Sequence, residues 1–313
     1  MEEGLFISLC IPAYRRTEFL QRLLDSIEAQ SYRHFEVVLT DDSPGREVQE
    51  LVDRHPLKSK IRYFKNAVTL GTPENWNESV RKAQYEWIKI MHDDDWFSGP
   101  ESLKAFANAV KFGNSRFYFA AFANHYPDGR TQKVAISTGH LEALKKNPGV
   151  LLAANRIGPP SVVLFRKDAT LEFDRRMQWL VDIDFYIAYL RKYPGVGFIS
   201  ESLVNIGISD SQVTHSSFGN RNIEIRERFL LGEKLPPQSM RNLVVFDSWW
   251  RFIRNMQIRE LHDIAENGYT GEIPATIQSL ITYQSRISPA LLRWGIGSKL
   301  LMFQQYLRSR NGY

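Results

Sequence analysis

Cysteine and long apolar runs are almost absent from the 313-residue sequence. Its single cysteine, Cys10, lies in the apolar run FISLCIP and cannot form an intrachain disulfide, which favours a reducing, cytoplasmic setting. No uninterrupted apolar run reaches the length of about 18 residues that a membrane-spanning helix needs. The N-terminus has no basic leader, so a secretory signal is not expected. These absences leave a soluble globular enzyme as the default class.

Familiar catalytic and nucleotide-binding signatures are also missing. The sequence contains no G-x-S-x-G, P-loop or G-x-G-x-x-G pattern. Apart from His215, considered below, its histidines show no spacing typical of metal ligands. Nucleotide or metal chemistry would therefore rest on other residues.

Acidic residues are missing from residue 286 onward, where the excess positive charge of the chain is concentrated. The net charge is +5, and this tail holds five cations, namely Arg286, Arg293, Lys299, Arg308 and Arg310. Because the rest of the chain is balanced, the basic pI describes a tail and not a nucleic-acid-binding face. Nucleic acid is not an expected partner.

The first third of the chain alternates short apolar runs with helical periodicity, the pattern of a mostly parallel α/β sheet. Strands are expected at residues 5–12, 35–40, 61–66 and 86–92, and a helix with a cap at Thr17 follows the first strand. From about residue 220 the pattern changes to helices without a clear strand. We therefore predict a domain at residues 1–218 and a helical region at residues 219–313.

Polar side chains follow three of the expected strands, in the segments IPAYRR, TDDS and HDDDW. In an open α/β sheet such loops meet in one crevice at the carboxyl ends of the strands, where ligands bind. The adjacent carboxylates of Asp93, Asp94 and Asp95 raise one another's pKa unless cations neutralise them. Mg²⁺ or Mn²⁺, shared with substrate phosphates, is the usual solution, and a solvated acidic turn is the alternative.

The order and spacing of four segments give a specific resemblance to a known family. CIPAYRR, SIEAQSYRHFEVVLTDDS, NAVTLGTPENWNESV and EWIKIMHDDDWFSGPESL together resemble the N-terminal half of family-2 inverting glycosyltransferases, which have the GT-A fold. The resemblance covers residues 5–112 closely and continues to about residue 215. It implies a Rossmann-like α/β sheet flanked by helices, here with a helical C-terminal extension. It also implies transfer of a sugar from a nucleotide diphosphate donor, with a UDP-sugar expected.

The same resemblance assigns roles to individual residues. The metal-binding DxD corresponds to Asp93 and Asp95, with Asp95 the direct ligand, Asp94 near the ribose, and a one-residue ambiguity because Trp96 replaces an acid of many relatives. His215 is a further candidate near the metal or diphosphate, against the alternative of an ordinary loop histidine. The expected donor-site residues are Pro12, Ala13 and Tyr14 at the base, Glu18 beside it, Asp42 at the base or ribose, and Asn75 and Trp76 at the flank.

A general base must remove the proton of an acceptor hydroxyl in the transition state. The resemblance places this base in the segment WLVDIDFYIAYL and makes it Asp182. Asp184 is a rival, because Val181 replaces the first acid of the usual pair. Without the resemblance, both aspartates would be read as favouring a helix N-terminus through the macrodipole.

Two questions stay open at the level of sequence. The tail from residue 286 fits an amphipathic helix on an anionic membrane surface, and it fits equally a helix packed on the protein with its arginines in water. A sugar-1-phosphate nucleotidyltransferase or an inactive nucleotide-sugar-binding protein would share the nucleotide and the fold. The main expectation is a transferase acting on a glycan or lipid-linked glycan in cell-surface polysaccharide synthesis, cytoplasmic and peripheral on the inner face of the cell membrane.

Overall fold

The computed structural model describes residues 4–209 and 219–311. The chain divides into two compact units, one of residues 1–141 and 156–212 and the other of residues 142–155 and 213–313. The sequence predicts a single boundary at residue 218. In the structure segment 142–155 groups with the C-terminal unit, and Arg228 of that unit donates a hydrogen bond to the Leu152 carbonyl of this segment at 2.6 Å.

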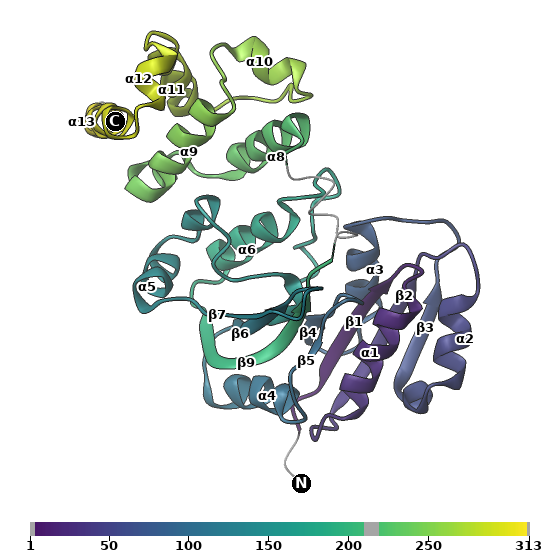
Figure 1. Cartoon of the computed structure of the whole chain (residues 1–313). Coiled ribbons are helices and arrows are strands. Elements are labelled where there is room, and N and C mark those ends of the chain that lie inside the picture. The colour runs from purple at the N-terminus through teal and green to yellow at the C-terminus, as the bar shows by residue number, and fades with distance from the viewer. Residues whose placement is uncertain (1–3, 210–218, 312–313) are drawn as a thin grey trace. The chain divides into compact units, whose positions relative to one another are not determined.

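One mixed sheet of nine strands, counted over the described residues, forms the centre of the first unit (Figure 1). The strand order is β3-β2-β1-β4-β8-β6-β9-β5, and β7 pairs with β6. The strands are β1 (Ile7–Ala13), β2 (Phe35–Asp41), β3 (Ile61–Lys65), β4 (Trp87–Ile90), β5 (Trp96–Phe97), β6 (Phe117–His125), β7 (Thr131–Val134), β8 (Val163–Arg166) and β9 (Gly197–Gly207).

The four N-terminal strands pair in parallel, with β1 between β2 and β4. The apolar side chains of β1, β2 and β4 are buried, so these strands are mostly apolar runs, whereas β3 at the edge of the sheet is only half-buried. The expectation of strands at 5–12, 35–40, 61–66 and 86–92 is confirmed. Because these strands are parallel, their carboxyl ends share one edge of the sheet.

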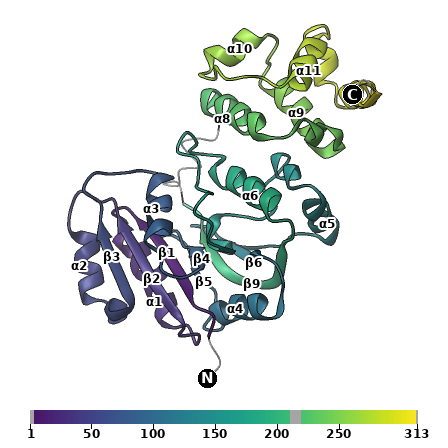
Figure 2. The same ribbon diagram turned by 180° about the vertical axis from the view of Figure 1, so that it is seen from behind.

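Helices lie on both faces of this sheet, as the two opposite views show (Figures 1 and 2). They are α1 (Thr17–Glu28), α2 (Glu47–Arg54), α3 (Glu74–Lys82), α4 (Ser102–Phe112) and α6 (Val181–Lys192). The helix α5 (Thr138–Lys146) contains the boundary between the two units. The predicted cap at Thr17 is wrong by one residue: Arg16 holds the N-cap position of α1 and makes no side-chain cap bond. Its guanidinium is therefore left to contact other groups.

The acidic triplet connects two strands that are far apart in the sheet. It follows β4, which pairs with β1, and it precedes β5, which pairs antiparallel with β9. Trp96 of β5 lies opposite Asn205 of β9. Both ends of the triplet are thus held by backbone pairing, which restricts where its carboxylates can point.

Among the residues described from 219 onward, every regular element is a helix, as the sequence predicted. The longer ones are α8 (Arg221–Lys234), α9 (Leu243–Asn255), α10 (Leu261–Glu266), α11 (Ala275–Ser285), α12 (Pro289–Arg293) and α13 (Gly295–Asn311). Phe229, Trp249 and Trp250 are buried at the centre of this unit. No described helix has both the length and the apolar character needed to cross a membrane.

Candidate active site

The loops after β1 and β2 meet at the carboxyl edge of the sheet. Asp42 donates its backbone N–H to the Ala13 carbonyl at 3.0 Å, and the backbone N–H of Arg15 donates to Ser43 Oγ at 2.8 Å. The strand β4 joins the same edge, because Met91 N donates to the Cys10 carbonyl at 2.9 Å. The three polar segments are therefore brought together at this edge of the sheet, as the sequence predicts.

The three carboxylates of the triplet are all buried, with at most 6% of any of these residues exposed. Burial raises the pKa of Asp93 to about 6, although the Arg16 guanidinium opposes this change. Burial, followed by the negative charge of Asp94, raises the pKa of Asp95 well above its usual range. Buried carboxylates in this state are stabilised by any cation that reaches them, and the structure supplies several.

Two arginines of α1 and its N-cap reach the triplet. Arg16 donates from Nε to Asp93 Oδ2 at 3.1 Å and from Nη1 to Asp94 Oδ2 at 3.2 Å, and its Nη2 contacts Asp93 Oδ1. Arg22 donates to the backbone carbonyl of Asp94 at 2.7 Å, and its guanidinium lies 3.7 Å from the centre of the Trp96 ring. Both oxygens of Asp93 are thus held by Arg16.

A third cation approaches from inside the protein. Lys89 of β4 is fully buried, and its ammonium donates to the backbone carbonyl of Ser161 in the short helix η3 (Pro160–Val162). The Ser161 hydroxyl accepts from His92 N at 3.0 Å and also hydrogen-bonds the Asp95 carboxylate. Burial lowers the pKa of Lys89 to about 7, and the charge of Asp95 opposes this shift. Ser161 therefore links a buried lysine to the base of the triplet.

The side chains that together could hold a metal ion are His92, Asp94 and Asp95. Their ligand atoms lie within 4.8 Å of one another, and His92 Nδ1 is 3.9 Å from Asp95 Oδ2. Burial lowers the pKa of His92 to about 4, so the imidazole is neutral near pH 7 and has a lone pair to offer. Carboxylate oxygens suit Mg²⁺ and Mn²⁺, and imidazole suits the transition metals. The residues present fit a divalent cation.

His92 is the residue that sequence reasoning missed at this position. The prediction pairs Asp93 with Asp95, with a register open by one residue; in the structure the ligand atoms of Asp94, Asp95 and His92 lie together, and Arg16 contacts both Asp93 and Asp94. The histidine directly precedes the triplet in the sequence, so its position was the available signal. His215, the other predicted metal residue, lies outside the described residues.

The predicted donor-site residues fall into two groups. Tyr14 and Glu18 are exposed, while Pro12 is half-buried and Ala13 is buried behind them. Trp76 is half-buried, and its ring lies 4.7 Å from the His92 ring, which brings α3 to the metal-ligand candidates. The Tyr14 ring is exposed, and the Arg15 guanidinium lies 5.1 Å from its centre.

Asp42 and Asn75 are instead buried and hold the neighbouring loop. Asp42 accepts from Asn66 Nδ2 at 2.6 Å, from Leu70 N at 3.1 Å and from Gly71 N at 2.8 Å. Asn75 donates to the Thr40 carbonyl at 3.2 Å. Gly71 has a φ of +72°, a left-handed conformation that glycine adopts without strain. These contacts hold the loop of residues 66–71 against the buried Asp42 carboxylate.

Both candidates for the general base lie in the first turn of α6. Asp184 is buried, whereas Asp182 is only half-buried. Asp182 Oδ1 accepts from the adjacent Ile183 N at 2.8 Å. The greater exposure of Asp182 favours it over Asp184 as the carboxylate that an acceptor can reach.

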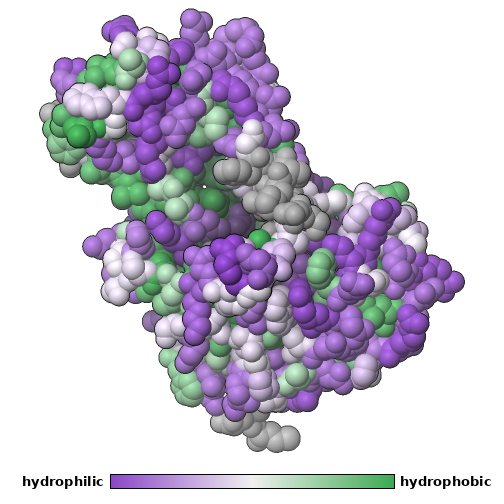
Figure 3. Space-filling view, in the orientation of Figure 1, coloured by the Kyte–Doolittle hydropathy of each residue, from purple (hydrophilic) through white to green (hydrophobic). Residues whose placement is uncertain are grey.

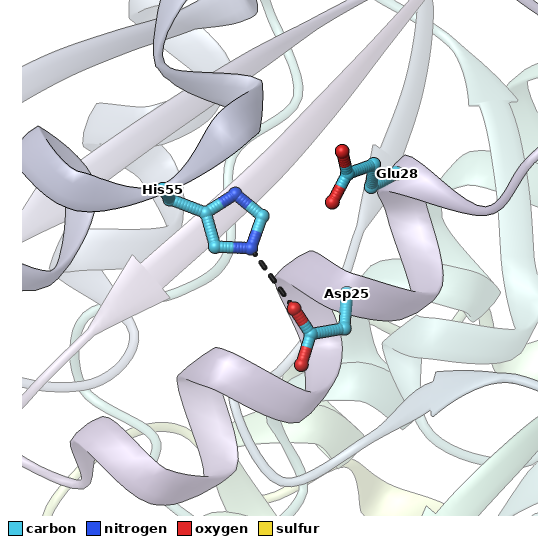
Figure 4. A group of neighbouring side chains, drawn as sticks. All are labelled: Asp25, Glu28 and His55. Carbon is cyan, nitrogen blue, oxygen red and sulfur yellow. Dashed lines mark hydrogen bonds and ion pairs between the residues drawn. The ribbon is translucent and has the colours of Figure 1, made fainter.

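A second histidine–carboxylate group lies at Asp25, Glu28 and His55 (Figure 4). His55 Nδ1 accepts from Leu57 N at 3.1 Å, so the proton of the neutral ring is on Nε2. Nε2 faces Asp25 Oδ1 at 3.1 Å. Both ring nitrogens are therefore engaged, and this group is a hydrogen-bonded contact between α1 and η1 (Pro56–Lys60) rather than a metal site.

An α/β sheet with a buried acidic triplet at the carboxyl ends of its parallel strands is the arrangement expected from the resemblance to the GT-A fold. Comparison with family models makes the assignment specific. Residues 8–173, more than half of the chain, match the model of Glycosyl transferase family 2. The chain belongs to this family.

Two of the following three curated relatives are named as sugar transferases. The chain is 26% identical over 262 residues to an uncharacterized protein of Mycobacterium tuberculosis, covering 78% of this chain and 81% of the other. It is 34% identical over 95 residues to abequosyltransferase RfbV of Salmonella typhimurium, covering 29% and 28%. It is 22% identical over 161 residues to UDP-Glc:alpha-D-GlcNAc-diphosphoundecaprenol beta-1,3-glucosyltransferase WfaP of Escherichia coli, covering 51% and 61%.

Solved structures share the fold. A fragment of S. aureus TarS in complex with UDP-GlcNAc matches with a TM-score of 0.64 and 16% identity, covering 98% of this chain and 92% of the other. Mannosyltransferase PcManGT of Pyrobaculum calidifontis, in complex with GDP-Man and Mn2+, matches with a TM-score of 0.56 and 14% identity, covering 98% and 86%. At these identities the similarity supports the GT-A fold alone.

Proposed function

We propose that this protein transfers one sugar from a nucleotide diphosphate sugar to a hydroxyl of a glycan or lipid-linked glycan, with inversion, in cell-surface polysaccharide synthesis. The observation that carries the proposal is the buried triplet Asp93–Asp95 at the carboxyl edge of the sheet, together with His92. Three adjacent buried carboxylates repel one another when ionised. A divalent ion bound together with a diphosphate would offset this repulsion. The family membership supplies the reaction class.

The donor is proposed to be a UDP-sugar. Similar folds have been solved with UDP-GlcNAc and with GDP-Man and Mn2+, and the name of WfaP specifies UDP-Glc. In this chain Tyr14 would stack on the base, with Pro12 and Ala13 behind it and Glu18 beside it. Asp42 would accept from the base or ribose with the lone pairs that the loop leaves over. Asn75 would hold that loop in place, and Trp76 would flank the donor.

In the proposed reaction the acceptor oxygen bonds to the anomeric carbon while the bond from that carbon to the diphosphate oxygen breaks. Asp182 takes the hydroxyl proton, which makes the oxygen nucleophilic as the bond forms. Asp95 and Asp94, with His92, would hold a divalent cation, Mg²⁺ or Mn²⁺, that offsets the charge of the departing diphosphate. Arg16 and Arg22 keep the carboxylates in position on the side of α1.

The acceptor is proposed to be lipid-linked. WfaP and a related Campylobacter jejuni protein are named for acceptors that carry undecaprenol. A lipid-linked acceptor requires that the enzyme work at a membrane surface, so we propose peripheral attachment at the inner face of the cell membrane.

A two-stage experiment tests the proposed function. A thermal-shift screen of nucleotide sugars with Mn²⁺ should identify a donor, because a ligand that binds only the folded state raises the melting temperature. The donor, labelled in its sugar, should then deliver label to a lipid extract of the source membranes. Binding without transfer would indicate a nucleotide-sugar-binding protein, and nucleotide-sugar synthesis from a sugar-1-phosphate would indicate a nucleotidyltransferase.

A further inference from the structure

The helix α13 packs into the C-terminal unit by one face. Ser298, Met302 and Tyr306 of this face are buried. The Ser298 hydroxyl accepts from Trp250 Nε1 at 3.0 Å, and the Tyr306 hydroxyl donates to the Arg241 carbonyl at 2.7 Å. This inner face matches one of the two sequence alternatives for the tail, a helix packed on the protein.

The opposite face of α13 is also apolar, and it is exposed. The side chains at positions 296, 300, 303 and 307 recur at helical spacing and therefore form one stripe. The outer apolar face consists of six exposed residues. Four belong to α13, namely Ile296, Leu300, Phe303 and Leu307, and two directly precede it, namely Leu291 of α12 and Trp294. Ile296 is 68% and Leu300 is 65% exposed, although the same helix buries its other side almost completely. Figure 3 shows hydrophobic surface where Figure 1 draws α13.

Exposed cations surround this face. Arg286, Arg293, Lys299 and Arg308 are exposed, and the sequence has no acidic residue from 286 onward. Lys299 pairs with Asp247 of α9 at 2.8 Å. Within the described part of the chain, no carboxylate forms an ion pair with the three arginines. They are therefore available to a negatively charged partner.

We propose that the outer apolar face docks on a lipid bilayer surface that contains anionic lipids. Apolar side chains including a tryptophan, flanked by unpaired arginines, are the composition of interfacial helices that bind such membranes. Because the inner face already fixes α13, docking orders few groups, which favours binding. The two sequence alternatives for the tail thus describe opposite faces of one helix. The outer apolar face would be the surface through which the proposed peripheral attachment occurs. Only the expectation that the acceptor lies in the membrane rests on the proposed function.

Co-sedimentation of the full chain with vesicles tests the proposal. Vesicles of phosphatidylcholine and phosphatidylglycerol should bind the protein, and vesicles of phosphatidylcholine alone should bind it weakly. A double variant that carries Leu300→Ser and Phe303→Ser should partition to these vesicles at least about tenfold less, because two large apolar side chains no longer enter the membrane interface. A double variant that carries Arg293→Gln and Arg308→Gln should reduce partitioning about fivefold for each cation removed. Added salt should also reduce the partitioning of the wild type, because it screens the remaining charges.

Matched controls separate this surface from general stickiness and from unfolding. Phe112 is 79% exposed at the end of α4 in the other unit, and Phe112→Ser should leave partitioning unchanged. All variants should keep the wild-type melting temperature and donor binding. A loss of sedimentation in such a variant then shows that the outer apolar face, and not unfolding, controls vesicle binding. Equal sedimentation of the wild type and the Leu300/Phe303 variant would overturn the proposal. A lipid-free dimer that the same variant dissociates would also overturn it and assign the face to a second copy.

Discussion

Arg16 contacts both carboxylate oxygens of Asp93, a residue 77 positions further along the chain. The arginine is at the N-cap of α1, and the aspartate follows β4, so the contact joins the first loop of the sheet to the acidic triplet. The same guanidinium also donates to Asp94 Oδ2 at 3.2 Å, so Arg16 joins two carboxylates of the triplet. Asp94 and Asp95 lie together with His92 as candidates for a metal ion, and the predicted metal role of Asp93 stays a prediction.

The buried carboxyl of Asp93 should make the metal-free protein lose stability as the pH rises through the weakly acidic range. Its pKa is raised to about 6 in the folded protein, from an ordinary value of 3.8. Between these values the folded state keeps a proton that the unfolded state has lost, so the free energy of unfolding falls with pH by about 3 kcal/mol. Urea denaturation of Asp93→Asn should lack this contribution. Identical pH slopes in the wild type and the variant would show that Asp93 ionises normally.

Lys89 should support metal binding through Ser161. In Lys89→Met the Ser161 carbonyl loses its buried donor, so the hydroxyl that contacts Asp95 and His92 N is less well held. We expect Mn²⁺ affinity to fall about tenfold or more in Lys89→Met and in Ser161→Ala, the range for outer partners of metal ligands. The double variant should lose little more than either single one, because the two residues act in series. Additive losses measured by calorimetry would disprove the link.

His92 should affect the choice of metal. Replacing His92→Phe keeps an aromatic ring against Trp76 and removes the nitrogen that lies 3.9 Å from Asp95 Oδ2. Mn²⁺ affinity should drop about tenfold and Mg²⁺ affinity should change less, because imidazole suits transition metals better than Mg²⁺. Electron spin-echo spectroscopy of bound Mn²⁺ should show a nitrogen coupling that the variant lacks. The same nitrogen coupling in both proteins would exclude His92 as a ligand.

Asp182 should be needed for turnover and not for donor binding. Asp182→Asn keeps the shape of the side chain and removes the base, so turnover should fall about a hundredfold or more. The donor dissociation constant should stay near the wild-type value. Asp184→Asn, two residues along the same helical turn, is the comparison. A large loss in Asp184→Asn with little in Asp182→Asn would transfer the role to the buried aspartate.

The sheet was predictable from the sequence because buried parallel strands are continuous apolar runs. The runs at β1, β2, β3 and β4 mark these strands within one or two residues, and the acidic triplet directly after one of them marks the carboxyl edge of the sheet. A helix cap is less certain, because Thr17 and Arg16 differ by one position and only the backbone conformation decides between them.

The partners of the triplet could not be read from the sequence. Arg16 contacts residues 77 and 78 positions away, Ser161 contacts Lys89 and His92 across 72 and 69 positions, and no local pattern specifies such pairs. Segment 142–155 groups with the C-terminal unit, and its contact with Arg228 is similarly distant in sequence. The tail presented a different difficulty: α13 has apolar residues on two faces, and the sequence alone does not say which face is covered.

The central claim is that Asp95 holds the divalent cation through which the nucleotide diphosphate is bound. The most direct test is calorimetric titration with UDP, with and without Mn²⁺, of the wild type, Asp95→Asn and Asp25→Asn. The last variant is the control, because it makes the same change in the second histidine–carboxylate group. Mn²⁺ should strengthen UDP binding in the wild type and in Asp25→Asn, and should have no effect in Asp95→Asn. Equal strengthening by Mn²⁺ in Asp95→Asn would contradict the claim.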